Sequence, residues 1–239
     1  MCTVTYIKHN DQYFFTSNRD ENIKRTSALH PQKYDSGDFH LYYPKDPQGN
    51  GTWFCIKNDG RICILLNGAQ KKHVSQGPYH KSRGLVLLEL IMKKEMISGW
   101  EALNLENIEP FTIIAFSNGM LHQLRWDGTN KESIPLNPDE AHIWSSATLY
   151  SDDIISQKKA MFEHFLFENI ANLDADRILN FHSTTKKEDV DAESQSISKE
   201  LVMTKNITQC IMTHKDFTLA HVDLLTDEKT IINAEIVVA

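Results

Sequence analysis

Long apolar runs and an excess of positive charge are both missing from this 239-residue chain, and glycine and proline are few. Its most apolar run, residues 85–92, is too short to span a bilayer. The formal net charge of −7 argues against a nucleic-acid-binding protein, because phosphate contacts need clustered Lys and Arg. What remains is an ordinary globular composition, 41% hydrophobic and 24% charged, which suffices for a sizeable core.

From its residues we expect neither a secretion signal nor a metal site. No basic segment is followed by an apolar one, and polar residues appear by His9. We therefore expect a cytoplasmic protein without stable membrane insertion, in which the four cysteines are reduced. Cys55 and Cys63 could face each other across a hairpin and are interpreted as core thiols, because the cysteine spacing does not match a zinc site. No metal and no cofactor is predicted.

Cys2 is the first residue with distinctive chemistry. Aminopeptidases remove an initiator Met when the next side chain is small, which would leave Cys2 with a thiol and a free α-amine on one residue. With reference pKa values of about 8.5 for a thiol and about 7.7–8.0 for an α-amine, the amine can take the thiol proton near neutral pH. An N-terminal threonine is activated by its own amine in the same way. Cys2 is therefore a candidate nucleophile, although most proteins with Cys at this position make no use of it.

Strand-like segments dominate the chain. Alternating residues 3–8 and 12–16 predict a hairpin that returns Asn18, Arg19 and Asp20 to the neighbourhood of Cys2. Further hairpins are predicted at the turns 58–60 and 118–119, where Asp-Gly and Asn-Gly supply positive φ. Residues 206–212, 218–224 and 230–237 are predicted to be three closing strands.

Helices and loops complete the predicted pattern. Helices are expected at residues 84–96, at residues 154–170 and from a cap at Asp174 to His182. Residues 22–50 and 186–200 are expected to be exposed loops, and residues 22–50 to contain one short strand near 41–43. Roughly ten strands in hairpins with two or three helices argue against a doubly wound α/β fold. The pattern predicts an α+β fold of two antiparallel sheets with helices outside.

Five short motifs carry a family resemblance. In chain order they are Met1-Cys2, Asn18-Arg19-Asp20-Glu21, Gly51-Thr52-Trp53, Leu66-Asn67 and Ser82-Arg83-Gly84-Leu85-Val86. Together they resemble the NRDE family of transport and Golgi organisation protein 2 homologues, most clearly over about the first 95 residues. That family is similar to N-terminal nucleophile (Ntn) hydrolases of the choloylglycine hydrolase and penicillin V acylase type. The resemblance implies a single domain over residues 1–239 with a four-layer αββα sandwich.

The resemblance also implies roles for particular side chains. Cys2 would be the nucleophile with its α-amine as the general base, Arg19 would favour the thiolate, and Asp20 would hold the amine. Asn67 would bind the substrate or its oxyanion. Asn18 and Ser146 are expected to contact the substrate.

Three features differ from the hydrolase pattern. Arg19 and Asp20 are adjacent, so at most one of them is expected to point inward along a strand. Ser146 stands where the hydrolases keep an oxyanion Asn, and their later catalytic Arg has only Lys158 or Lys159 as a loose counterpart. A retained Met1 would also place the amine one residue too far away.

Two functions are therefore expected as alternatives. The first is an amidohydrolase that cleaves a linear, non-peptide amide of a small molecule through an acyl thioester. The second is a non-catalytic protein of the same fold that binds haem, a lipid-like ligand or another small molecule, or acts in membrane trafficking and Golgi organisation. The sequence indicates neither the substrate nor the oligomeric state.

Overall fold

A computed structural model describes residues 3–185 and 202–237, so Cys2 and the predicted loop at 186–200 lie outside the described part of the chain. The described strands form two antiparallel sheets. The first sheet has six strands in the order β10-β1-β2-β11-β12-β13, and the second has seven in the order β3 to β9. Their bounds are β1 Thr3–His9, β2 Gln12–Asn22, β3 Leu29–Ser36, β4 Phe39–Lys45, β5 Phe54–Lys57, β6 Ile62–Asn67, β7 Phe111–Ser117, β8 Met120–Trp126, β9 Lys131–Leu136, β10 His142–Ser145, β11 Val202–Met212, β12 Asp216–Asp223 and β13 Lys229–Glu235.

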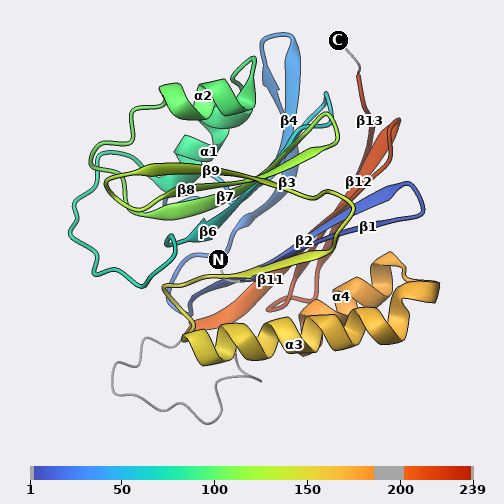
Figure 1. Cartoon of the computed structure of the whole chain (residues 1–239). Coiled ribbons are helices and arrows are strands. Elements are labelled where there is room, and N and C mark those ends of the chain that lie inside the picture. Colours follow the sequence, from blue (N-terminus) through green and yellow to red (C-terminus); the bar gives the residue numbers. More distant parts are fainter. Residues whose placement is uncertain (1–2, 186–201, 238–239) are drawn as a thin grey trace.

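Helices cover the outer face of each sheet. Helices α1 (Arg83–Ile91) and α2 (Met96–Ala102) lie on the second sheet, while α3 (Asp152–Asn169) and α4 (Ala175–Thr184) lie on the first. A short 3₁₀ turn, Ile170–Asn172, joins α3 to the segment before α4. Figure 1 shows the four layers in the order helices, sheet, sheet, helices, as the resemblance implied. None of these helices is long and apolar enough to cross a membrane.

The β1–β2 hairpin is the element around which the site is built. Its turn is at Asn10 and Asp11, both with positive φ, and the register pairs Thr3 with Asn18. Strand β2 continues beyond the hairpin and pairs with β11 along its length, with a bulge at Lys205. The sequence correctly predicted the hairpin and the turn, but not the pairing with a strand almost two hundred residues away.

Two apolar clusters hold the layers together. The larger lies between the sheets and under α1 and α2, and includes Phe15, Phe54 and the fully buried Trp100. The smaller joins the first sheet to α3 and α4 through residues such as Phe14 and Phe162. Burial of each such side chain contributes about 1.5–3 kcal/mol to the stability of the folded protein. The two clusters therefore stabilise the packing of the sheets on each other and of the helices on their outer faces.

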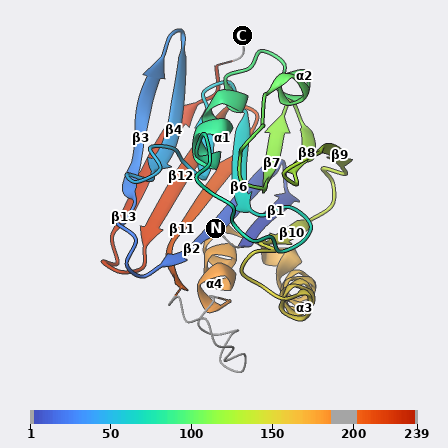
Figure 2. The ribbon, with the colours of Figure 1, turned by 90° about the vertical axis from the view of Figure 1, so that its left-hand side faces the viewer.

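The segment after β2 differs from the expectation. Residues 22–50 were expected to be a long surface loop with one short strand, but they contain the hairpin β3–β4. Tyr34 stacks on Tyr43 with ring centroids 4.0 Å apart, and β3 lies against β13 of the other sheet, as Figure 2 shows. The polar composition misled the sequence interpretation because β3 is an edge strand that exposes much of its surface to solvent.

Helix boundaries follow the capping residues. The Ser82 hydroxyl accepts from the Leu85 amide at the start of α1, and Asp174 caps α4 in the same way. The helix expected at residues 84–96 ends early, at Ile91, and the short helical piece expected around residues 100–105 is α2, which begins at Met96 and ends at Ala102. Cys55 and Cys63 are direct cross-strand partners, are fully buried and are free thiols, in agreement with the interpretation as core residues.

Candidate active site

Strand β2 presents candidate residues to both of its faces. Phe15 belongs to the cluster between the sheets and Phe14 to the cluster under the helices, so odd residues point between the sheets and even residues point to the helix layer. Arg19 therefore faces the second sheet and Asp20 faces the helices. The expectation that at most one of the two points inward holds, yet both are buried because helices cover the second face.

A small cavity lies where Arg19 meets the second sheet. Its volume is about 150 Å³. Arg19 and Asn67, two of the residues expected to be catalytic, both line it. The other lining residues are Glu21, Arg25, Asp46, Gly49, Gly51, Thr52, Trp53, Leu65, Ser82, Arg83 and Gly84.

Charged groups fix the Arg19 guanidinium in this cavity. Its Cζ lies 4.8 Å from the Trp53 ring centroid, and its Nη2 lies 3.6 Å from Glu21 and 3.8 Å from Asp46. Arg25 donates to Asp46 at 2.6 Å and lies 3.5 Å from Glu21. Burial raises the pKa of Asp46, but the hydrogen bond from Arg25 and the charges of Arg25 and Arg19 outweigh it and hold that pKa below its usual value. Asp46 is therefore ionised and restrains both arginines.

Asn67 and Ser146 are brought together from strand ends 79 residues apart in sequence. The Ser146 hydroxyl donates to the Asn67 carbonyl oxygen at 2.7 Å and lies 2.9 Å from the Thr148 hydroxyl. Gly68, with φ +82°, follows Asn67, and a Cβ there would lie 2.7 Å from the Thr148 side chain. The close approach explains why glycine follows Asn67 at this strand end.

Asp20 lies in a separate buried polar cluster on the helix side of the sheet. It accepts from Tyr150 at 2.8 Å and from Thr204 at 2.5 Å. Lys158 of α3 lies 4.8 Å from the Tyr150 ring centroid and donates to the Thr185 carbonyl. Of the two lysines that the sequence offered, Lys158 is thus part of this cluster, whereas Lys159 is exposed and pairs with Glu163.

Asn18 does not reach the cavity. Its side-chain Oδ1 accepts from the Nδ1–H of His182 at 2.7 Å, and its side-chain nitrogen donates to the His182 carbonyl at 3.1 Å. The other imidazole nitrogen lies 2.8 Å from the Thr5 hydroxyl. Burial and the charge of Lys158 lower the pKa of His182 to about 3. Asn18 therefore anchors α4 to the first sheet through a neutral histidine.

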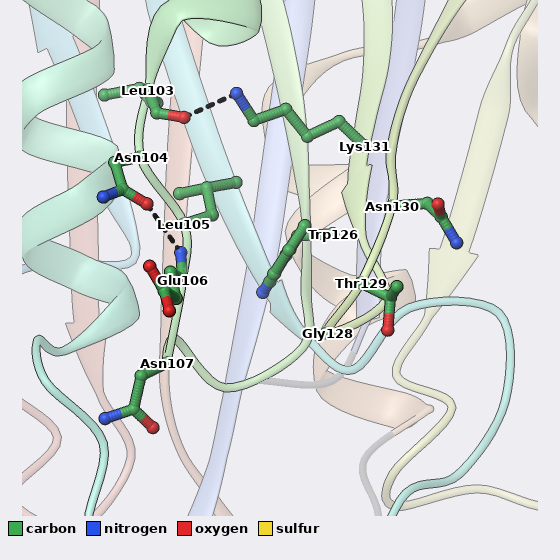
Figure 3. Close-up of a pocket in the computed structure, with 10 residues that line it drawn as sticks. All are labelled: Leu103, Asn104, Leu105, Glu106, Asn107, Trp126, Gly128, Thr129, Asn130 and Lys131. Atoms are coloured by element: carbon green, nitrogen blue, oxygen red, sulfur yellow. Dashed lines mark hydrogen bonds between the residues drawn. The ribbon is translucent and has the colours of Figure 1, made fainter.

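A larger cavity, about 610 Å³ in volume, lies away from all of the predicted residues. It is bordered by the loop that follows α2 and the turn between β8 and β9 (Figure 3). Its cationic group, Lys131, donates to the carbonyls of Trp100, Glu101 and Leu103 and so terminates α2. Size does not identify the site here, because this cavity contains no nucleophile with an adjacent base among its lining residues.

Several residues of the Arg19 cavity and of the polar cluster at Asp20 were not found from the sequence. Tyr150, Thr204, Asp46 and Arg25 come from four different segments, and no local spacing connects them. Lys158 was named from the resemblance together with Lys159, and its spacing of four residues from the buried Phe162 on α3 is the signal that separates it from the exposed Lys159. Among the residues that the structure describes, no group of three or more His, Cys, Asp or Glu is arranged to hold a metal.

Solved structures with the same fold are Ntn hydrolases. A mutant of conjugated bile acid hydrolase from Clostridium perfringens superimposes with a TM-score of 0.58 at 10% identity, covering 100% of this chain and 98% of the other. The N-acylethanolamine-hydrolyzing acid amidase orthologue of Caenorhabditis elegans gives 0.58 at 11% identity, with coverages of 87% and 92%. Penicillin V acylase from Agrobacterium tumefaciens gives 0.54 at 8% identity, with coverages of 98% and 86%. These likenesses establish an Ntn hydrolase fold.

No curated protein matches the sequence significantly. The profile of the family described as Transport and Golgi organisation 2 matches residues 1–230, nearly the whole chain, including the motifs that carry the NRDE resemblance. The chain therefore belongs to the Transport and Golgi organisation 2 family.

Proposed function

We propose that the protein is an N-terminal cysteine amidohydrolase that cleaves a linear, non-peptide amide of a small molecule. One observation carries the proposal: the buried Arg19 and the strand-end Asn67 line the same cavity. Arg19 lies on β2, the strand that pairs with the beginning of β1. The similarity of the fold to three amide hydrolases supports the reaction class. The cytoplasm is the proposed location.

The proposed nucleophile is Cys2, which precedes the first described residue. Thr3, the first described residue, lies opposite Asn18, which immediately precedes Arg19. Val4 belongs to the cluster between the sheets, the side to which Arg19 also points. The described start of β1 therefore lies beside the residues proposed to act with Cys2, and a guanidinium near the sulfur would favour the thiolate.

In the proposed mechanism the α-amine of Cys2 takes the thiol proton, and the sulfur attacks the amide carbonyl carbon. The C–N bond then breaks, the amine leaves with a proton, and an acyl thioester remains on Cys2. Water, deprotonated by the same amine, attacks the thioester and releases the acid. Asp20 holds the amine, Asn67 donates to the oxyanion, and Asn18 acts through His182 as a positioning residue.

Removal of Met1 decides whether this mechanism is available. Intact-mass measurement of the purified protein should show the loss of one methionine. The processed protein should hydrolyse at least one of three amides, a conjugated bile acid, penicillin V or an N-acylethanolamine, and Cys2→Ala should abolish this activity. Unchanged turnover in Cys2→Ala, or a retained Met1 in active protein, would refute the proposal.

A non-catalytic role in binding haem, lipid or another small molecule, or in trafficking, is the second candidate. The observation that favours it is the hydrogen bond of Ser146, whose only O–H proton is donated to the Asn67 carbonyl and is therefore not offered to an oxyanion. The family description, Transport and Golgi organisation, favours it as well. Titration with haem and with acyl amides separates the two functions, because a carrier gives a spectral or calorimetric signal without released acid.

A further inference from the structure

The cavity at Arg19 contains hydrogen-bond donors that the proposed chemistry does not use. Trp53 lines the cavity and is only 2% exposed, and its Nε1–H has no hydrogen-bond partner among the described residues. A buried indole N–H normally has a hydrogen-bond acceptor. The missing acceptor of Trp53 therefore indicates that a bound ligand supplies it.

Helix α1 begins at the same cavity. Arg83 and Gly84 are its first two residues, and both line the cavity together with the capping Ser82. The first amides of a helix have no intrahelical acceptor and carry the positive end of the helix dipole. Gly84 approaches the neighbouring chain so closely that a Cβ would lie 2.7 Å from the Thr52 carbonyl oxygen, which seats the helix end against Thr52 and Trp53.

The charged residues that line the cavity are three arginines and two acidic residues. Glu21 and Asp46 are matched by Arg19 and Arg25 through the contacts described above. Arg83 remains, and its partner Glu109, at 3.0 Å, is not among the residues that line the cavity. The lining residues therefore include three guanidinium groups and two carboxylates, with the Glu109 carboxylate outside the lining, and they include the indole N–H of Trp53, which has no acceptor among the described residues.

We propose that this cavity binds a carboxylate group of the ligand, held by Arg83, the Trp53 indole N–H and the amides at the start of α1. Resting on the proposed function, this assigns the substrate to amides that also carry a carboxylate, as N-acyl amino acids do. A volume of about 150 Å³ accommodates such an end group, with the acyl chain lying outside it. Planar guanidinium and indole donors suit the two oxygens of a carboxylate.

The test compares two probes that differ only in charge, N-dodecanoylglycine and N-dodecanoylglycinamide. Calorimetry on the Cys2→Ala protein measures both dissociation constants without turnover. We expect the acid to bind about tenfold or more tightly than the amide, since hydrogen bonds to a charged group are the stronger ones. That ratio should fall toward one in Arg83→Gln and in Trp53→Phe, and Arg83→Lys should restore part of it.

Lys81→Gln is the matched control, because Lys81 pairs with Glu89 on the surface and does not line the cavity. It should keep the ratio of the parent protein. Equal binding of the two probes, no binding of either, or an unchanged ratio in Arg83→Gln would overturn the proposal. A variant that has unfolded binds neither probe and is recognised by its circular dichroism, so the ratio is compared only among folded variants; Arg83→Lys and Trp53→Phe supply the test if Arg83→Gln does not fold.

Hydrolysis of the same probes, measured with Cys2 intact, tests the proposed function separately. Selective binding without released glycine would refute the hydrolase and leave the carboxylate site standing. Cleavage of both probes with equal binding would refute the carboxylate site and leave the hydrolase standing.

Discussion

At the scale of single residues, the strand alternation of β2 separates two tasks. Arg19 faces the cavity between the sheets, and Asp20 faces a polar cluster under the helices. Both are buried, so each must be fully compensated by partners, because an uncompensated buried charge costs several kcal/mol. Asp46 and Glu21 compensate the arginine, and Tyr150 and Thr204 compensate the aspartate.

The Tyr150 hydroxyl gives a test at this scale. Tyr150→Phe removes the donor to Asp20 and keeps the ring beside Lys158. We expect a loss of about 1–3 kcal/mol in the free energy of unfolding, because a buried carboxylate loses a donor. Tyr79→Phe is the control, since within the described part of the chain the Tyr79 hydroxyl accepts from the exposed Gln76 amide and has no other hydrogen-bond partner. Urea unfolding measures both, and an equal cost in the two variants would contradict the assignment.

At the scale of elements, the beginning of α1 connects two loops of the second sheet, the β4–β5 loop and the segment before β7, to the cavity. The Ser82 hydroxyl accepts from the Leu85 amide and donates to the Gly49 carbonyl at 2.9 Å. Arg83 reaches across to Glu109 and to the Pro110 carbonyl before β7. The cap therefore orients the helix end that the cavity uses, in addition to starting the helix.

Ser82→Ala should destabilise the protein by about 1 kcal/mol for the cap alone, and by more if the Gly49 contact also contributes. Ser151→Ala is the matched control: the Ser151 hydroxyl caps α3 through Ile154 at an exposed helix end and has no second partner among the described residues. Thermal unfolding followed by circular dichroism compares the two. A larger effect in Ser151→Ala would argue against the linking role of Ser82.

At the scale of the whole molecule, two buried neutral histidines make stability depend on pH. His182 joins β1 and β2 to α4, and its pKa is lowered to about 3 by burial and by Lys158. His221, between the sheets, has its pKa lowered to about 4 by burial, with the charges of His30 and Arg19 adding to the effect. In the unfolded chain both recover a pKa of about 6.5.

The unfolded chain therefore binds more protons than the folded protein between pH 6.5 and the folded values. The free energy of unfolding should be fully retained above about pH 6.5 and should fall as the pH is lowered below it, by about 1.4 kcal/mol per pH unit for each histidine. Urea unfolding at pH 7 and pH 5 measures the slope. His182→Gln should flatten it, whereas replacement of the exposed His164 should not; an equal slope in all three proteins would contradict the assignment.

The sequence by itself determined the local structure. Asn-Gly and Asp-Gly turns, alternating strands and the caps at Ser82 and Asp174 act through neighbouring residues, so the hairpins and helix starts were predictable. The motif resemblance added the layer order and brought Cys2, Arg19, Asp20 and Asn67 forward as candidates. The β3–β4 hairpin was missed because an exposed edge strand carries few apolar residues.

Only the tertiary structure decided which candidates meet. Ser146 reaches Asn67, Asn18 turns to His182, and Asp20 joins Tyr150, Thr204 and Lys158 through contacts between segments far apart in the chain. The sheet is covered on both faces, so adjacent strand residues occupy different buried layers, and sequence alternation alone does not say what fills each layer. Partners at such separations are selected by the packing of the two sheets and their helices, which no local spacing encodes.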